Sequence, residues 1–232
     1  MDGSLTKIER DRIFVIYIIA FFVIFFWAAY EQAGASLTLF AAEQTDRTIF
    51  GWEMPASWIQ SFNPFFVVIL AAIMPSVWGA LNKRGMEPAS PTKQAIGLLL
   101  LSLGYLVICF GVKDVQPGVK VSLIWLTGLY FIHTMGEIAL SPIGLSMVNK
   151  LTPVRFASLM MGIWYLSTST ANKFAGTLGG LYPEDGKVKT LLGFRIETMF
   201  DFFMVFVIMS GVASLILFLL SKKLQKMMHG VE

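Results

Sequence analysis

The sequence predicts an all-α integral membrane protein with six transmembrane helices, and three observations lead to that prediction. Hydrophobic residues make up 56% of the 232 residues and charged residues only 14%, whereas soluble domains carry roughly 25% charged residues. The uncharged residues gather in long runs, and a helix needs roughly 20 such residues to cross the hydrocarbon core. Two acids, Glu31 and Glu137, are each the only charged residue in an apolar run.

The apolar runs predict six spans, because backbone groups in lipid must be paired within a helix. We place these spans at residues 13–40, 56–82, 94–112, 121–149, 156–180 and 199–221. An even number of crossings puts both termini on one side of the membrane. The fifth span carries one charge, Lys173, which we expect near its outer end with the ammonium reaching the interface.

The distribution of Lys and Arg predicts the orientation. With six spans, eleven basic residues fall on the side of the termini and six on the opposite side. The richer side is expected to be cytoplasmic. Both termini are therefore predicted to lie in the cytoplasm, which suits a bacterial inner (plasma) membrane.

Composition argues against several other classes of protein. One cysteine, Cys109, and two scattered histidines offer no metal or redox cluster, so no cofactor is expected. The net charge of +3 is too small and dispersed to indicate nucleic-acid binding. The polar start, MDGSLTKIERDR, does not resemble a cleavable signal peptide.

The two lone acids indicate transport. A carboxylate at the bilayer centre costs about 2.5–3.5 kcal/mol on insertion scales, and such groups usually relay protons, bind ions or pair with cations. Glu31 follows Trp27 by one turn, so we expect a weakly hydrated setting that suits a proton carrier. A salt bridge to another helix is the structural alternative.

The fourth span places three polar residues on one helical face. His133, Glu137 and Ser141 are four residues apart. Pro142 lacks an N–H and therefore frees the carbonyl of Ile138, next to Glu137. A kinked helix with a carboxylate at the kink suits a binding site in a moving part. For His133 a packing role is expected.

Two further residues are candidates for ligand binding. Asn63 precedes Pro64 at the start of the second span, where its amide either binds a ligand or caps the helix break. Trp164, in the fifth span, offers an aromatic wall for a side-chain pocket, while the neighbouring Ser, Thr and Gly residues favour close helix packing.

Four segments together resemble the proton-dependent oligopeptide transporter family of the major facilitator superfamily. They read FFWAAYEQAGASLTLFA, TDRTIFGWEMPASWIQSFNPFF, HTMGEIALSPIGLSMVNKLTP and MMGIWYLSTSTANKFAGTLGGLYP. The match is to the carboxyl-terminal half of the family and covers nearly the entire chain. The six spans would then be the seventh to twelfth helices of a twelve-helix transporter.

The resemblance implies a role for each candidate. Glu137 resembles the acid that binds the peptide's amino terminus and takes part in proton coupling, and Asn63 the asparagine that assists it. Glu31 resembles the glutamate tied to proton coupling. Trp164 resembles the pocket tryptophan and Ser141 a polar group of the same pocket.

The sequence also departs from the family. Ala72 stands where proline is frequent, which affects the bend of the second span. The E-x-x-E-R-F motif and the lysine of the amino-terminal half are absent, so the acids lack the cations that the family supplies from there. The chain is therefore expected to be half of a proton-coupled di- and tripeptide symporter, with the lipid bilayer and an amino-terminal six-helix half as partners.

Other functions stay open from sequence alone. The same fold could carry nitrate or a drug-like substrate, since fold does not fix function. An intramembrane hydrolase or metal enzyme would need a nucleophile–base pair or clustered ligands, for which His133 and Glu137 are the only candidates. A non-transporting six-helix subunit would leave Glu31 and Glu137 unexplained.

Overall fold

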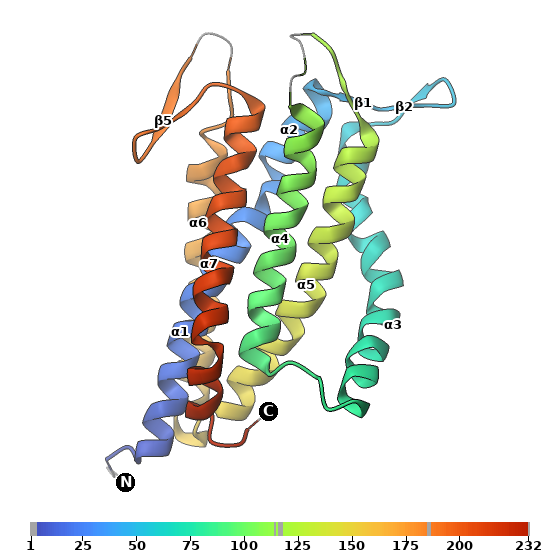
Figure 1. Cartoon of the computed structure of the whole chain (residues 1–232). Coiled ribbons are helices and arrows are strands. Elements are labelled where there is room, and N and C mark those ends of the chain that lie inside the picture. Colours follow the sequence, from blue (N-terminus) through green and yellow to red (C-terminus); the bar gives the residue numbers. More distant parts are fainter. Residues whose placement is uncertain (1–3, 114, 116–117, 185–186, 232) are drawn as a thin grey trace.

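The computed structural model describes residues 4–113, 115, 118–184 and 187–231. Long helices run side by side between two ends of the molecule, and both termini lie at the same end (Figure 1). The helices are α1 (Lys7–Tyr30), α2 (Ser36–Glu43), α3 (Phe62–Lys83), α4 (Ser90–Val112), α5 (Leu123–Leu151), α6 (Ala157–Gly179) and α7 (Met199–Met227).

Shorter elements connect these helices. The 3₁₀ helices are η1 (Glu31–Gly34), η2 (Ala56–Ser61) and η3 (Val154–Phe156). The strands are β1 (Thr45–Asp46), β2 (Thr48–Ile49), β3 (Trp52–Glu53), β4 (Val121–Ser122), β5 (Lys189–Leu191) and β6 (Phe194–Ile196). β1 pairs in parallel with β4, whereas β2–β3 and β5–β6 are antiparallel hairpins. The strands lie at the end opposite the termini (Figure 1).

The first predicted span is not one continuous helix. α1 stops at Tyr30, η1 follows, and α2 begins at Ser36. Gln32 fixes this break, because its buried amide donates to the carbonyls of Ala28 (3.1 Å) and Ala175 (2.9 Å). The hydroxyl of Ser36 donates to the Gln32 side-chain oxygen at 2.7 Å.

Several helices extend beyond the predicted spans. α1 begins at Lys7 because Thr6 and Glu9 form a capping box that starts the helix before its apolar part. α7 continues to Met227, past Lys222 and Lys223. An uncharged run predicts only the apolar part of a helix. The helix itself can continue through polar turns at either end.

Within the described residues, five helical segments are long and apolar enough to cross a membrane. They are Lys7–Glu43, Ala56–Lys83, Ser90–Val112, Leu123–Leu151 and Met199–Met227. The fifth predicted span, residues 156–180, forms as the 23-residue helix α6, but it does not reach the same hydropathy. Its STSTANK stretch accounts for the polar character.

α4 packs most extensively against α5 and α7, and glycines bring α4 and α5 close together. A Cβ added to Gly97 would lie 2.9 Å from the Gly136 carbonyl oxygen, and one added to Gly104 would lie 2.3 Å from the His133 ring. Small residues let helix backbones approach in this way.

α3 stands at the edge of the bundle, beside α5 (Figure 1). Only 11% of its most apolar window is buried. It packs through a small cluster formed by Leu70, Met74 and Ala139, apart from the main core. α3 is therefore the long helix with the weakest apolar attachment among those described.

Candidate functional site

Glu137 lies in the middle of α5, half-buried, and one of its carboxylate oxygens accepts two hydrogen bonds. The Tyr30 hydroxyl donates to Oε2 at 2.5 Å, and Nδ2 of Asn63 donates to the same oxygen at 2.9 Å. α1, α3 and α5 thus meet at one carboxylate.

Asn63 reaches this point because it sits in the first turn of α3, immediately after η2. Its amide donates to the Tyr30 hydroxyl oxygen at 2.5 Å and to Oγ1 of Thr134 at 3.2 Å, besides Glu137. Pro64 falls in the same first turn, where a missing N–H costs little. At the point where we expected a helix break, η2 passes into α3.

Sequence reasoning missed Tyr30. Its hydroxyl bridges Asn63 and Glu137. The available signal was that a buried tyrosine usually finds a hydrogen-bond partner. A tyrosine directly before a lone acid, in an otherwise apolar run, had few nearby polar groups to choose from.

Ser141 and Trp164 continue the row that begins at Glu137. Ser141 is one helical turn further along α5, and Gly144 lies on the same face two turns from Glu137. Trp164 of α6 is buried against that glycine, since a Cβ on Gly144 would lie 2.6 Å from the indole. Trp164, from the neighbouring helix α6, therefore lies at the Gly144 end of this row of residues.

The Glu31 side chain is exposed on the surface of this chain, and its weakly hydrated setting stays a prediction. The η1 turn that follows Tyr30 directs these two consecutive residues differently, with Tyr30 contacting Glu137 and Glu31 left exposed. The carboxylates of Glu31 and Glu137 still interact electrostatically.

His133 takes no part in the hydrogen bonds around Glu137. Its Nε2 lies 3.2 Å from the Leu101 carbonyl oxygen, and its ring packs on Tyr105 with centroids 4.7 Å apart. This is the packing role that we expected. Within the described ranges, no group of three or more His, Cys, Asp or Glu residues is arranged to hold a metal ion.

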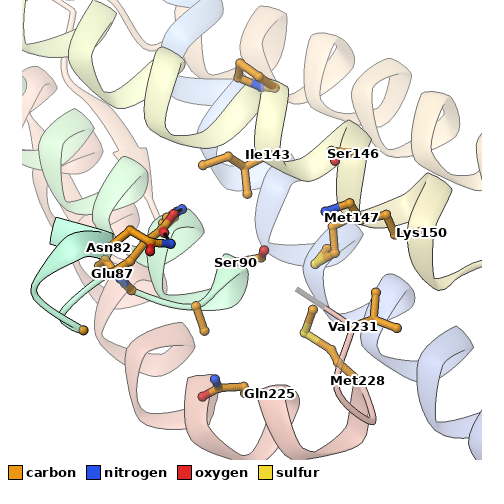
Figure 2. A pocket seen from close by; sticks show the side chains of 15 residues that line it. Asn82, Glu87, Ser90, Ile143, Ser146, Met147, Lys150, Gln225, Met228 and Val231 are labelled. Carbon is orange, nitrogen blue, oxygen red and sulfur yellow. Dashed lines mark hydrogen bonds and ion pairs between the residues drawn. The ribbon is translucent and has the colours of Figure 1, made fainter. Parts of the chain in front are cut away.

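A separate cavity of about 560 Å³ opens at the end of the molecule that holds the termini. Figure 2 shows Asn82 and Glu87 together on one side of it and Gln225, Met228 and Val231 on another. Lys93, nearly buried, pairs with Glu87, and Nδ2 of Asn82 donates to Glu87 at 2.5 Å. The Lys93 and Asn82 hydrogen bonds lower the pKa of the Glu87 carboxyl.

Comparison with known proteins connects this architecture to a family. Residues 4–192 match the PTR2 model, described as the POT family. The chain is 37% identical over 185 residues to the peptide transporter YePEPT of Yersinia enterocolitica, covering 79% of this chain and 36% of that protein. It is 30% identical over 218 residues to the dipeptide and tripeptide permease A of Escherichia coli, covering 94% and 43%.

Solved structures of peptide transporters have a fold similar to that of this chain. A crystal structure of a mutant of the peptide transporter POT in complex with alafosfalin superposes with a TM-score of 0.85 at 30% identity, covering 99% of this chain and 44% of that one. A POT family transporter in complex with 5-aminolevulinic acid gives 0.79 at 27% identity, covering 96% and 44%.

The chain belongs to the POT family and is an integral membrane protein with an all-α fold. It spans less than half the length of the relatives it matches. The matched relatives are transporters, which agrees with the transport class that the lone acids indicated.

Proposed function

We propose that this chain is the carboxyl-terminal half of a proton-coupled di- and tripeptide symporter, and that Glu137 binds the amino terminus of the peptide. The observation that carries the proposal is the setting of Glu137. Among the described residues its hydrogen bonds come from two neutral groups, Tyr30 and Asn63. A half-buried carboxylate without a cation of its own is suited to bind a ligand's ammonium group.

The other candidates take roles around this pair. Asn63 holds Glu137 and adds a polar contact to the ligand, Ser141 provides a hydroxyl one turn away, and Trp164 walls the far end of the row. Glu31 takes up the coupling proton. Its exposed position and its electrostatic interaction with Glu137 support a role in which the charge on one acid influences the other.

The charge of Glu137 also distinguishes between the possible classes of substrate. Nitrate would be repelled by an ionised Glu137, whereas the ammonium group of a peptide would be attracted. The setting therefore favours a peptide over nitrate and gives no reason to propose an enzyme or a cofactor other than the proton.

The missing cations come from an amino-terminal six-helix half. In transporters built from repeats, binding sites lie at the interface of the repeats near the bilayer midplane. The exposed Glu31 and the polar helix α6 fit such an interface better than a lipid-facing surface. Both termini lie at the end rich in Lys and Arg, which we assign to the cytoplasm of a bacterial inner membrane.

Substitution of Glu137 tests the proposal. The chain is joined to the amino-terminal half of a relative, such as the permease of Escherichia coli, and proton-driven uptake of a labelled dipeptide is measured in vesicles. Glu137→Gln keeps the size of the side chain but removes the charge, and a hydrogen bond to a charged group contributes about 1.5–3 kcal/mol. We expect uptake to be lost.

The control is Glu197→Gln, an exposed acid at the far end of the bundle that pairs with Arg195. It should transport like the parent protein. Uptake at normal affinity by Glu137→Gln would remove Glu137 from the binding site, and a parent protein that carries nitrate but no peptide would contradict the assigned substrate.

A further inference from the structure

Tyr30 occupies the central position in the hydrogen bonds around Glu137. Its hydroxyl donates to Oε2 of Glu137 at 2.5 Å and accepts from the Asn63 amide at 2.5 Å. The Asn63 amide has two N–H groups and shares them among three acceptor oxygens, those of Tyr30, Thr134 and Glu137. The Tyr30 hydroxyl is therefore the contact that has Glu137 as its single acceptor.

Two aromatic rings pack against the Tyr30 ring. Phe26 stacks on it with centroids 5.5 Å apart and planes 16° apart, and Trp27 meets it edge-on at 5.3 Å. These rings belong to the same helix, so they fix the phenol relative to α1.

The backbone beneath Tyr30 is also held. The buried Tyr105 hydroxyl of α4 donates to the Ala29 carbonyl at 2.6 Å. The Gln32 amide joins the Ala28 carbonyl to that of Ala175 in α6. Two neighbouring helices thus set the position from which Tyr30 reaches Glu137.

The two donors hold the same oxygen of the carboxylate. Each hydrogen bond that Glu137 accepts among the described residues goes to Oε2, which leaves Oε1 for another donor. A fixed Oε2 limits rotation of the carboxylate and so sets the direction in which Oε1 points. Positioning of this kind lowers the entropy lost when a ligand binds.

The chemistry of the phenol matters as much as its place. A lysine or arginine at position 30 would pair with Glu137 and satisfy its charge. A neutral hydroxyl orients the carboxylate and leaves the charge available.

We propose that Tyr30 is a positioning residue for peptide recognition, which acts through Glu137 by holding Oε2 so that Oε1 meets the ammonium group of the ligand. This inference rests on the proposed function. It adds that affinity depends on a hydroxyl that belongs to the first span and precedes Glu31 directly.

The test is Tyr30→Phe in the joined transporter described above, with dipeptide uptake measured over a range of concentrations. Phenylalanine keeps the ring contacts with Phe26 and Trp27 and removes only the hydroxyl. A hydrogen bond to a charged group contributes about 1.5–3 kcal/mol, which corresponds to roughly a 10- to 150-fold change in binding. We expect KM to rise at least about tenfold, with a smaller change in kcat.

Tyr130→Phe is the matched control. Tyr130 is buried on α5, and its hydroxyl has no hydrogen-bond partner among the described residues. The same chemical change there should leave KM within about twofold of the parent value, which is far below the effect of a charged hydrogen bond.

A double-mutant cycle separates positioning from a purely structural role. Binding of a dipeptide is measured calorimetrically for the parent, Tyr30→Phe, Glu137→Gln and the double variant. If Tyr30 acts through Glu137, its loss costs little once Glu137 is Gln, so the effects are strongly non-additive. Additive effects, or an unchanged KM in Tyr30→Phe, would overturn the inference while leaving peptide transport intact. A parent protein without peptide uptake would overturn the proposed function, and the inference with it.

Discussion

At the scale of residues, two consecutive positions have opposite surroundings. Tyr30 ends α1 and contacts Glu137, whereas Glu31 begins η1 and is exposed. The change from α to 3₁₀ geometry at this point separates them. A proton on Glu31 would remove its repulsion of the Glu137 carboxylate, which gives the two acids a direct physical means of influencing each other.

Glu31→Gln should therefore uncouple proton movement from peptide movement in the joined transporter. The neutral side chain imitates a permanently protonated acid. We expect counterflow (exchange of peptide without a proton gradient) to survive better than gradient-driven uptake, both measured in the same vesicles. An equal loss of the two activities would assign Glu31 to structure or to ligand binding.

At the scale of elements, the contact between α4 and α5 depends on glycine. A Cβ at Gly97 would lie 2.8 Å from the Leu140 Cβ and 2.9 Å from the Gly136 carbonyl oxygen, so the helices must move apart. Forcing extra volume into a packed interior costs about 1–3 kcal/mol. Gly97→Ala should thus lower the midpoint of thermal unfolding of the chain in detergent.

Gly79→Ala is the control for that measurement. Gly79 lies in α3 and has no atom within 4 Å of an added Cβ. Alanine favours helix by up to about 1 kcal/mol over glycine. The unfolding midpoint of Gly79→Ala should be equal to or higher than that of the parent protein. A similar decrease in both variants would show that the α4–α5 contact is not the cause.

The contacts that attach α3 near the termini predict that the stability of the fold depends on pH. Glu87 lies in the connection between α3 and α4, and it pairs with Lys93, whose ammonium lies 5.0 Å from the Trp78 ring of α3. The Lys93 and Asn82 hydrogen bonds lower the pKa of Glu87 from 4.5, its value without such contacts. A lowered pKa in the folded state means that the ionised form stabilises the fold above about pH 4.5, and that this contribution is lost as the pH falls.

Glu87→Gln should remove this part of the pH dependence. We expect unfolding midpoints measured from pH 7 down to pH 3 to fall less steeply for the variant than for the parent protein. The matched control is Glu53→Gln, an acid that pairs with Arg47 at the other end of the bundle. Parallel curves for Glu87→Gln and the parent would show that Glu87 contributes nothing to this dependence.

At the scale of the molecule, the proposed function makes this chain half of a binding site. Glu137 and Asn63 are assembled, while Glu31 is exposed and α6 is too polar to be classed with the other spanning helices. Such surfaces are costly in lipid, so a second set of helices is expected to cover them.

The 232-residue chain by itself should accordingly insert into membranes but show no saturable dipeptide binding by calorimetry. We expect self-association in detergent, measured by light scattering. Co-expression with an amino-terminal half of the family should restore binding, because it supplies the cations that pair with Glu31 and Glu137. Micromolar binding by the chain alone would demonstrate a complete site and contradict the half-transporter assignment.

The sequence by itself determined the class of fold and most of the candidate site. Apolar runs predicted the long helices because lipid leaves a backbone few other ways to pair its polar groups. Glu137 and Asn63 stood out because polar groups are costly in such runs. Periodicity along one helix then placed Ser141 on the face of Glu137.

Only the tertiary structure decided which groups meet across helices. The break after Tyr30 depends on Gln32 bonding to Ala175, a residue 143 positions away. After that break Tyr30 contacts Glu137, while Glu31 is exposed on the surface of this chain. Local patterns set the face of a helix on which a residue lies, but the rotation of one helix against another follows from packing along the full chain.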